Sequence, residues 1–138
     1  MKNALAALRH YLADYAEVNV LCDGRVYTGD SIPLDDTEKR PKPCVLLRGS
    51  SGQPSRRLDT IIEQSFDVIC LEETAEKASR LDLAVFQAIK TLDRKIVDGV
   101  LLHNVLASPS ASQEREQETL WPATRRPAVL RADEREVE

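Results

Sequence analysis

The fold is decided by residues 61–93, which read IIEQSFDVICLEETAEKASRLDLAVFQAIKTLD. Residues 61–71 predict a strand, because apolar and polar side chains alternate along them. Residues 75–93 predict an amphipathic helix, with Thr74 as its N-cap and Glu76 beside the positive end of its dipole. The helix places one apolar stripe on a single face, wide enough to cover a sheet: Ala78, Leu81, Val85, Ala88, Ile89 and Leu92.

The chain before this stretch predicts a helix, a long loop and a strand. Residues 2–16 space their apolar side chains three and four apart, and we expect this helix to end before Val18. Asp23 and Gly24 mark a turn. Residues 44–48 predict a buried strand. Residues 49–57, GSSGQPSRR, are rich in glycine and serine and predict a turn that joins this strand to the one at 61–71. These two strands predict an antiparallel hairpin.

After the helix, Asp98 and Gly99 predict a turn, and residues 100–107 predict a third strand. Residues 108–127 form a polar segment, and residues 128–133 predict a short last strand before an acidic end. We therefore expect one α+β domain over residues 1–138: a mainly antiparallel sheet of about four strands, two helices packed on one of its faces, and long contact loops.

Composition limits the classes of function. The chain has 138 residues and a net charge of -4, which is the wrong sign for a general binder of nucleic acid or of an anionic membrane. Aromatic residues make up only 4% of the chain, too few for a platform that stacks single-stranded bases. No apolar run approaches the roughly 20 residues that span a bilayer, and the first residues do not form a secretory leader. We expect a cytosolic protein whose three cysteines, Cys22, Cys44 and Cys70, are reduced and packed as small hydrophobes.

Catalytic patterns are not found in the sequence. His10 and His103 lie far apart without neighbouring ligands, so no metal site is expected. The stretch GSSGQPSRR lacks the lysine of a phosphate-binding loop, and the sequence has no nucleophile elbow. The acidic pairs at residues 35–36 and 72–73 lie in charged segments, where solvated carboxylates are the expected state. We expect no enzyme activity, no cofactor and no metal.

Contact surfaces are predicted instead. Residues 27–42 and 108–127 are long, charged and aperiodic, and such loops tend to be functional. A cluster of arginines around the hairpin turn is either a polar tip or a basic patch that meets an acidic partner or passing DNA. Trp121 either anchors its loop to the core or fills a partner's pocket. The candidate contact residues are Asp30, Leu34, Asp35, Asp36, Arg40, Arg48, Arg56, Arg57, Trp121, Arg125 and Arg126.

An ordered series of segments resembles one family. LAALRHYLADYAEV at residues 5–18, GRVYTG at 24–29, RPKPCVLLRGSSGQP at 40–54 and the strand–helix unit at 64–93 are together similar to tail-completion proteins of long-tailed bacteriophages. These proteins are also called tail terminators, and the likeness covers residues 1 to 107.

The resemblance implies a structural function. Such a protein forms a ring, usually hexameric, on the head-proximal end of the tail tube, stops tube polymerisation and provides the docking surface for the head and neck. The implied partners are further copies of the chain, the tube protein and a connector or neck protein. DNA passes through the lumen without being read, no membrane is involved, and the protein is assembled in the host cytoplasm into the virion tail.

Three other interpretations stay open at this stage. The nearest is a head–tail connector or stopper ring, which differs in binding the portal side rather than the tube. The second is a small enzyme whose site is completed between subunits. The third is a bacterial interaction module with no phage origin.

Overall fold

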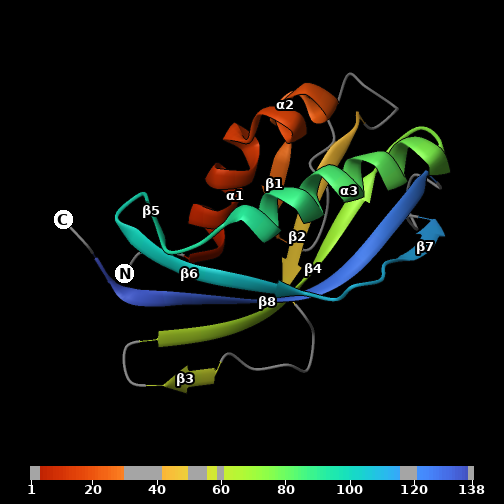
Figure 1. Ribbon diagram of the computed structural model, residues 1–138. Coiled ribbons are helices and arrows are strands. Elements are labelled where there is room, and N and C mark those ends of the chain that lie inside the picture. Colours follow the sequence, from red (N-terminus) through yellow and green to blue (C-terminus); the bar gives the residue numbers. More distant parts are fainter. Residues whose placement is uncertain (1–3, 30–41, 50–55, 59–60, 116–120, 137–138) are drawn as a thin grey trace.

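The computed structural model describes residues 4–29, 42–49, 56–58, 61–115 and 121–136. Within these residues, three helices lie on one face of a strongly curled sheet (Figure 1). The helices are α1 (Ala4–Asp14), α2 (Ala16–Cys22) and α3 (Ala75–Thr91).

The sheet contains eight strands among the described residues. Its main path runs through β1 (Val26–Thr28), β2 (Cys44–Gly49), β4 (Ile61–Leu71), β8 (Pro122–Glu136), β6 (Val100–Ala107) and β5 (Lys95–Val97). Two further strands lie off this path: β3 (Arg56–Leu58) pairs with β4, and β7 (Ser112–Arg115) pairs with β8. The sheet is mixed, because β1 runs parallel to β2 while the other pairs are antiparallel.

The predicted fold class is therefore wrong. In place of about four antiparallel strands and two helices, the described residues form a curled, mixed sheet of eight strands with three helices. Four of the strands, β1, β3, β5 and β7, are only three or four residues long. Alternation needs about four to eight residues to show in a sequence, so these strands gave no periodic signal.

The last strand accounts for the largest error in the predicted boundaries. Residues 128–133 were expected to form a short strand after a loop, whereas β8 spans fifteen residues and begins at Pro122. On its helix-facing side β8 carries Thr124, Arg126, Ala128, Leu130 and Ala132, all of them buried. The first two are polar and two others are small, so the buried alternation was not visible as a hydrophobic pattern.

The N-terminal helix is also divided differently from the prediction. Tyr15 adopts an extended backbone conformation that separates α1 from α2, and the chain then continues as helix through Cys22. Asp23 closes α2 in the left-handed region, at φ 54°, and Gly24 follows at φ 73°. The predicted turn at these two residues is confirmed, but the expected end of the helix before Val18 is wrong.

The strand–helix unit at the centre of the sequence is confirmed. β2, β4, α3 and β6 lie within two residues of their predicted bounds at each end. The hydroxyl of Thr74 accepts a hydrogen bond from the backbone N–H of Lys77 at 3.2 Å, as expected of an N-cap. Asp98 and Gly99 form the predicted turn, both with positive φ.

The main core lies between the helices and the sheet. Its large, fully buried side chains come from α1, α3 and the central strands, and include Leu8, Leu12, Phe66, Leu81, Leu102 and Leu130. All three cysteines are reduced and buried, which confirms their predicted packing. Burial raises the pKa of the Cys70 thiol well above its usual range, and the nearby carboxylate of Asp82 adds to this rise.

A buried ion pair joins α3 to β8. Arg126 and Asp82 are each 4% exposed, and the guanidinium donates two hydrogen bonds to the carboxylate, at 2.7 and 3.2 Å. The guanidinium also lies 4.1 Å from the centre of the Phe86 ring and donates to the carbonyl of Ser108. Because the pair is bidentate and enclosed, it fixes how the helix sits on the longest strand.

Removal of one member of this pair is expected to destabilise the fold strongly. Asp82→Ala leaves an uncompensated buried guanidinium, so urea unfolding should show a loss of about 3–5 kcal/mol. Asp82→Leu combined with Arg126→Met should cost much less, because no charge is then left buried. The matched control is Asp67→Ala, which breaks the more exposed Arg48–Asp67 pair and should cost about 0–1 kcal/mol. Equal losses for the two single variants would contradict a structural role for the buried pair.

Candidate assembly surfaces

The predicted contact residues fall into three groups. Asp30, Leu34, Asp35, Asp36 and Arg40 lie outside the described residues. Arg56 and Arg57 belong to β3, where their backbones pair with Glu63 and Ile62 of β4, and only the backbone placement of these two arginines is described. The others, Arg48, Trp121, Arg125 and Arg126, lie in or beside β2 and β8.

The face of the sheet turned away from the helices carries part of the predicted set. We call it the open face, and it includes Arg48 of β2, Asp67 of β4 and Arg125 of β8. Successive side chains of a strand point to opposite faces, so Arg125 lies on the open face while Arg126 is buried against α3. The register thus separates two arginines that the sequence had placed in one contact set.

Ion pairs link neighbouring strands across the open face. Arg48 lies opposite Asp67 in the ladder, with their charged groups 3.8 Å apart, and Arg131 donates to Glu63 at 3.0 Å. The Nε of Arg125 is buried and finds no hydrogen-bond partner among the described residues. Buried polar groups are normally paired, so this nitrogen of Arg125 is an exception, as is the Oδ1 of Asn104, which lies opposite Arg131.

One end of the open face is apolar. A second cluster of buried side chains lies there: Cys44, Leu46, Ile69, Leu71 and Ala123, with Tyr27 and Trp121 packed against them. Burial is the main cause of the raised pKa of the Tyr27 hydroxyl. Of the two interpretations of Trp121, this packing favours the anchor to its own core.

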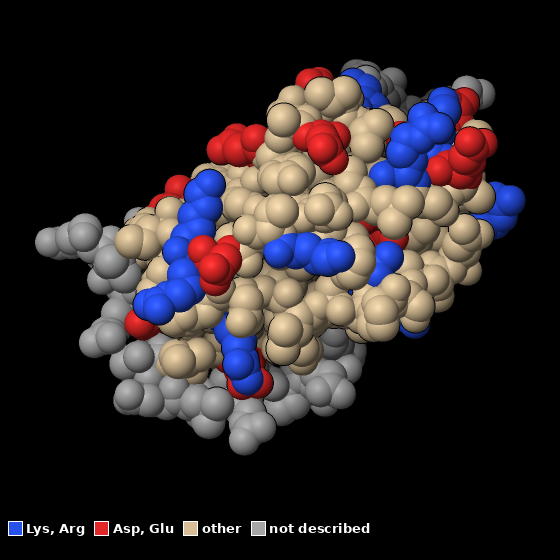
Figure 2. All heavy atoms as spheres, viewed as in Figure 1, with Lys and Arg blue, Asp and Glu red and all other residues tan. Residues whose placement is uncertain are grey.

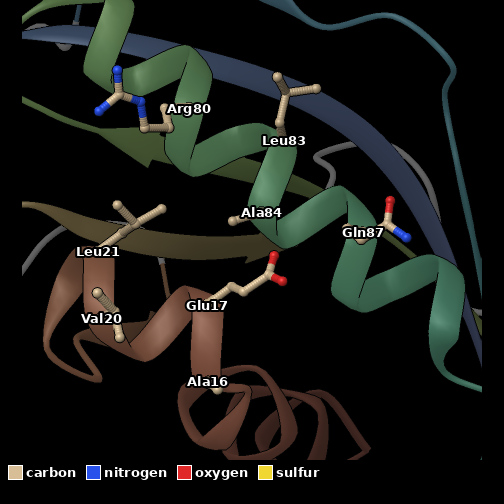
Figure 3. A pocket seen from close by; sticks show the side chains of 8 residues that line it. All are labelled: Ala16, Glu17, Val20, Leu21, Arg80, Leu83, Ala84 and Gln87. Atoms are coloured by element: carbon tan, nitrogen blue, oxygen red, sulfur yellow. The ribbon is translucent and has the colours of Figure 1, made fainter.

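A groove between α2 and α3 was missed by the sequence analysis. It has a volume of about 610 Å³ and is lined by apolar side chains and a few polar ones from the two helices: Ala16, Glu17, Val20, Leu21, Arg80, Leu83, Ala84 and Gln87 (Figure 3). Val20 is 82% exposed and Leu83 62%, high values for large aliphatic side chains. The groove was overlooked because α2 was not predicted, although Val18, Leu21 and Cys22 recur at helical spacing.

The edge strand β5 carries a third exposed apolar residue. Ile96 is 52% exposed and borders a shallow depression of about 340 Å³ together with Tyr11 and Tyr15. The ammonium group of Lys95 lies 5.2 Å from the centre of the Tyr11 ring. Asp98 contacts His10 of α1, so the hairpin of β5 and β6 is tied to the first helix.

The charged groups on the helix side are dispersed. Figure 2 shows a mostly uncharged surface in this view, with acidic and basic groups scattered over it rather than gathered by sign. Among the described residues, no group of three or more His, Cys, Asp or Glu side chains is placed to hold a metal ion. No helix in the described part of the chain is long and apolar enough to cross a membrane.

Comparison with solved structures finds similar folds. The chain resembles a chain from the structure titled virion of native gene transfer agent (GTA) particle, with a TM-score of 0.63. The likeness covers 94% of both chains at 17% sequence identity, so it concerns the fold. No protein-family model matches the sequence, and no curated protein matches it either.

The packing of Trp121 can be tested through its fluorescence, because it is the only tryptophan in the chain. The isolated protein should show a blue-shifted emission that moves to the red on unfolding, since the indole packs on the second cluster. Trp121→Ala should reduce the free energy of unfolding in urea, by less than the roughly 1.5–3 kcal/mol that a fully buried large apolar side chain contributes, because Trp121 is only partly buried. Trp121→Phe is the control and should lose less. Solvent-like emission that shifts only when a partner is added would contradict the anchor.

Proposed function

We propose that the chain is a structural protein of a phage-like virion and acts as a tail terminator. One observation carries the proposal: the fold likeness to a chain of a gene transfer agent virion extends over 94% of both chains. A likeness of this extent relates most of the chain rather than one strand–helix unit. The sequence resemblance to tail-completion proteins over residues 1 to 107 points to the same class.

In this proposal the chain forms a ring, hexameric as in the resembled family, on the head-proximal end of the tail tube. The ring stops the addition of tube subunits and presents a docking surface to the neck. Closure of a ring requires a heterologous interface, in which one patch of a subunit meets a different patch of the next. The α2–α3 groove, the β5 edge and the open face are three distinct surfaces on different elements, and they suit that requirement.

The charges are compatible with a ring through which DNA passes. A protein that neutralises phosphates with lysine or arginine binds DNA more tightly for each contact it makes. Here the chain has a net charge of -4, and two arginines of the open face are paired with Asp67 and Glu63. A lumen lined by such pairs gives DNA little to hold, so the genome moves through it without being read.

The proposed role needs no catalysis, cofactor or metal. The ring is placed in the virion tail and is assembled in the host cytoplasm from the chain, tube protein and neck protein. Its action is mechanical and steric: it covers the growing end of the tube and offers a different surface on the other side.

The test is to mix the purified protein with tail tubes polymerised from the tube protein of the same particle, and to image the ends by negative stain. Rings on one end only, with tube growth stopped, are the expected result. Tubes without the protein are the control and should continue to lengthen. Bare, growing tubes would contradict termination, and binding to the portal complex in the same assay would then favour the connector ring.

A further inference from the structure

Of the four large apolar side chains in the described residues that are more than half exposed, three form two patches, one on α2 and α3 and one on the β5 edge; the fourth, Leu106 of β6, belongs to neither. Among the described residues, Val20 and Leu83 flank the α2–α3 groove, and Ile96 lies on the β5 edge. In Figure 1, β5 lies at the left end of the molecule and the facing parts of α2 and α3 lie to its right. The chain thus carries an apolar groove and an apolar projection on the β5 edge. The depression beside Ile96 meets the groove at Ala16, which lines both, but Val20 and Leu83 on one side and Ile96 on the other belong to different elements.

The groove holds a carboxylate that makes no ion pair within the described part of the chain. Glu17 extends from α2 into the gap towards α3 (Figure 3), and no cation of the described residues lies within ion-pair distance of it. Arg80 lies towards the other end of the groove on α3, where it makes an exposed ion pair of 3.7 Å with Glu76. The groove therefore presents an acid and a base on either side of apolar side chains.

The β5 edge presents matching groups on a fixed backbone. Arg94 and Lys95 precede Ile96, and Asp93 supplies an exposed carboxylate before them. The backbone N–H of Arg94 donates to the carbonyl of His103 at 3.0 Å, and Arg94 has a positive φ of 48°. These restraints hold Ile96 in place, so little conformational entropy is lost when it is buried by a partner.

We propose that Ile96 on the β5 edge of one subunit inserts into the α2–α3 groove of the next copy, between Val20 and Leu83. Arg94 then lies beside Glu17, and the negative charge of Asp93 is opposite to the positive charge of Arg80. This inference rests on the proposed ring, for which it identifies the heterologous contact. Within one subunit, the pairing of β5 with β6 holds Ile96 on the sheet edge, where it lines a different depression with Tyr11 and Tyr15.

A cross-link tests the geometry directly. The native cysteines are buried, so new surface cysteines can be oxidised selectively. Protein carrying Leu83→Cys together with Ile96→Cys should give a ladder of covalent oligomers in the assembled state, ending at the closed ring. The matched control pairs Leu83→Cys with Leu106→Cys, since Leu106 is 58% exposed but belongs to neither patch. A ladder from the control and none from the test pair would overturn the proposal.

A charge exchange tests the chemistry. Glu17→Lys should weaken subunit association at least tenfold in sedimentation velocity, and Glu17→Lys with Arg94→Glu should restore most of the loss. Glu114→Lys on β7 is the control, because it makes the same change at an exposed site away from the groove. All these positions are exposed, and a thermal unfolding scan checks that each variant folds. Unchanged association of Glu17→Lys, or the absence of rescue, would overturn the contact.

The outcomes separate this contact from the proposed function. Wild-type rings that cap tubes, together with a Glu17→Lys variant that still forms rings, would reject the groove contact and leave termination standing. Rings of Glu17→Lys that fail only to cap tubes would also reject it and assign the groove to the tube protein. Wild-type protein that forms no ring with or without tubes would reject both.

Discussion

The pairing of β8 with β4 and β6 is the constraint on which the rest of the structure depends. β8 pairs with β4 through residues 123–133 and with β6 through residues 128–136, so it lies between these two strands in the sheet. Because side chains alternate along a strand, this register fixes which residues of β8 face the helices. It directs Arg126 towards Asp82 of α3 and Arg125 to the opposite face. The buried ion pair then couples the longest strand to the longest helix.

This division produces two faces of different character. The helices close over the main core. The large apolar side chains that stay exposed beside them are Val20 and Leu83 at the α2–α3 groove and Ile96 on β5. The open face holds Arg48 and Arg131 in cross-strand pairs with Asp67 and Glu63, beside a small apolar cluster that includes Trp121. A subunit of this kind can use its helix side and edges for contacts with copies of itself and leave the open face for another role. The proposed ring assigns that face to the passage of DNA.

The sequence predicted the parts of the fold whose pattern is strong and local. α3 and β4 were found because their apolar residues repeat over many positions and Thr74 marks the boundary between them. The predicted last strand was too short, because the buried side chains of β8 include Thr124 and Arg126. The burial of these polar residues depends on partners distant in sequence. The groove was not predicted because α2 was not predicted. The seven residues of α2 are too few to show a clear helical repeat of apolar side chains. Of the predicted contact residues, those at positions 30–40 lie outside the described part of the chain, and the burial of Arg126 depends on Asp82, 44 positions away.

The central claim is that several copies of this chain close into one ring at one end of a tail tube. Counting the copies tests it most directly, by photobleaching fluorescently labelled protein on surface-bound tubes and recording the number and position of the steps. The account predicts a single bright site at one end of each tube, with a fixed number of steps that matches the hexameric ring. Single-step sites, or sites scattered along the length of the tubes, would contradict it.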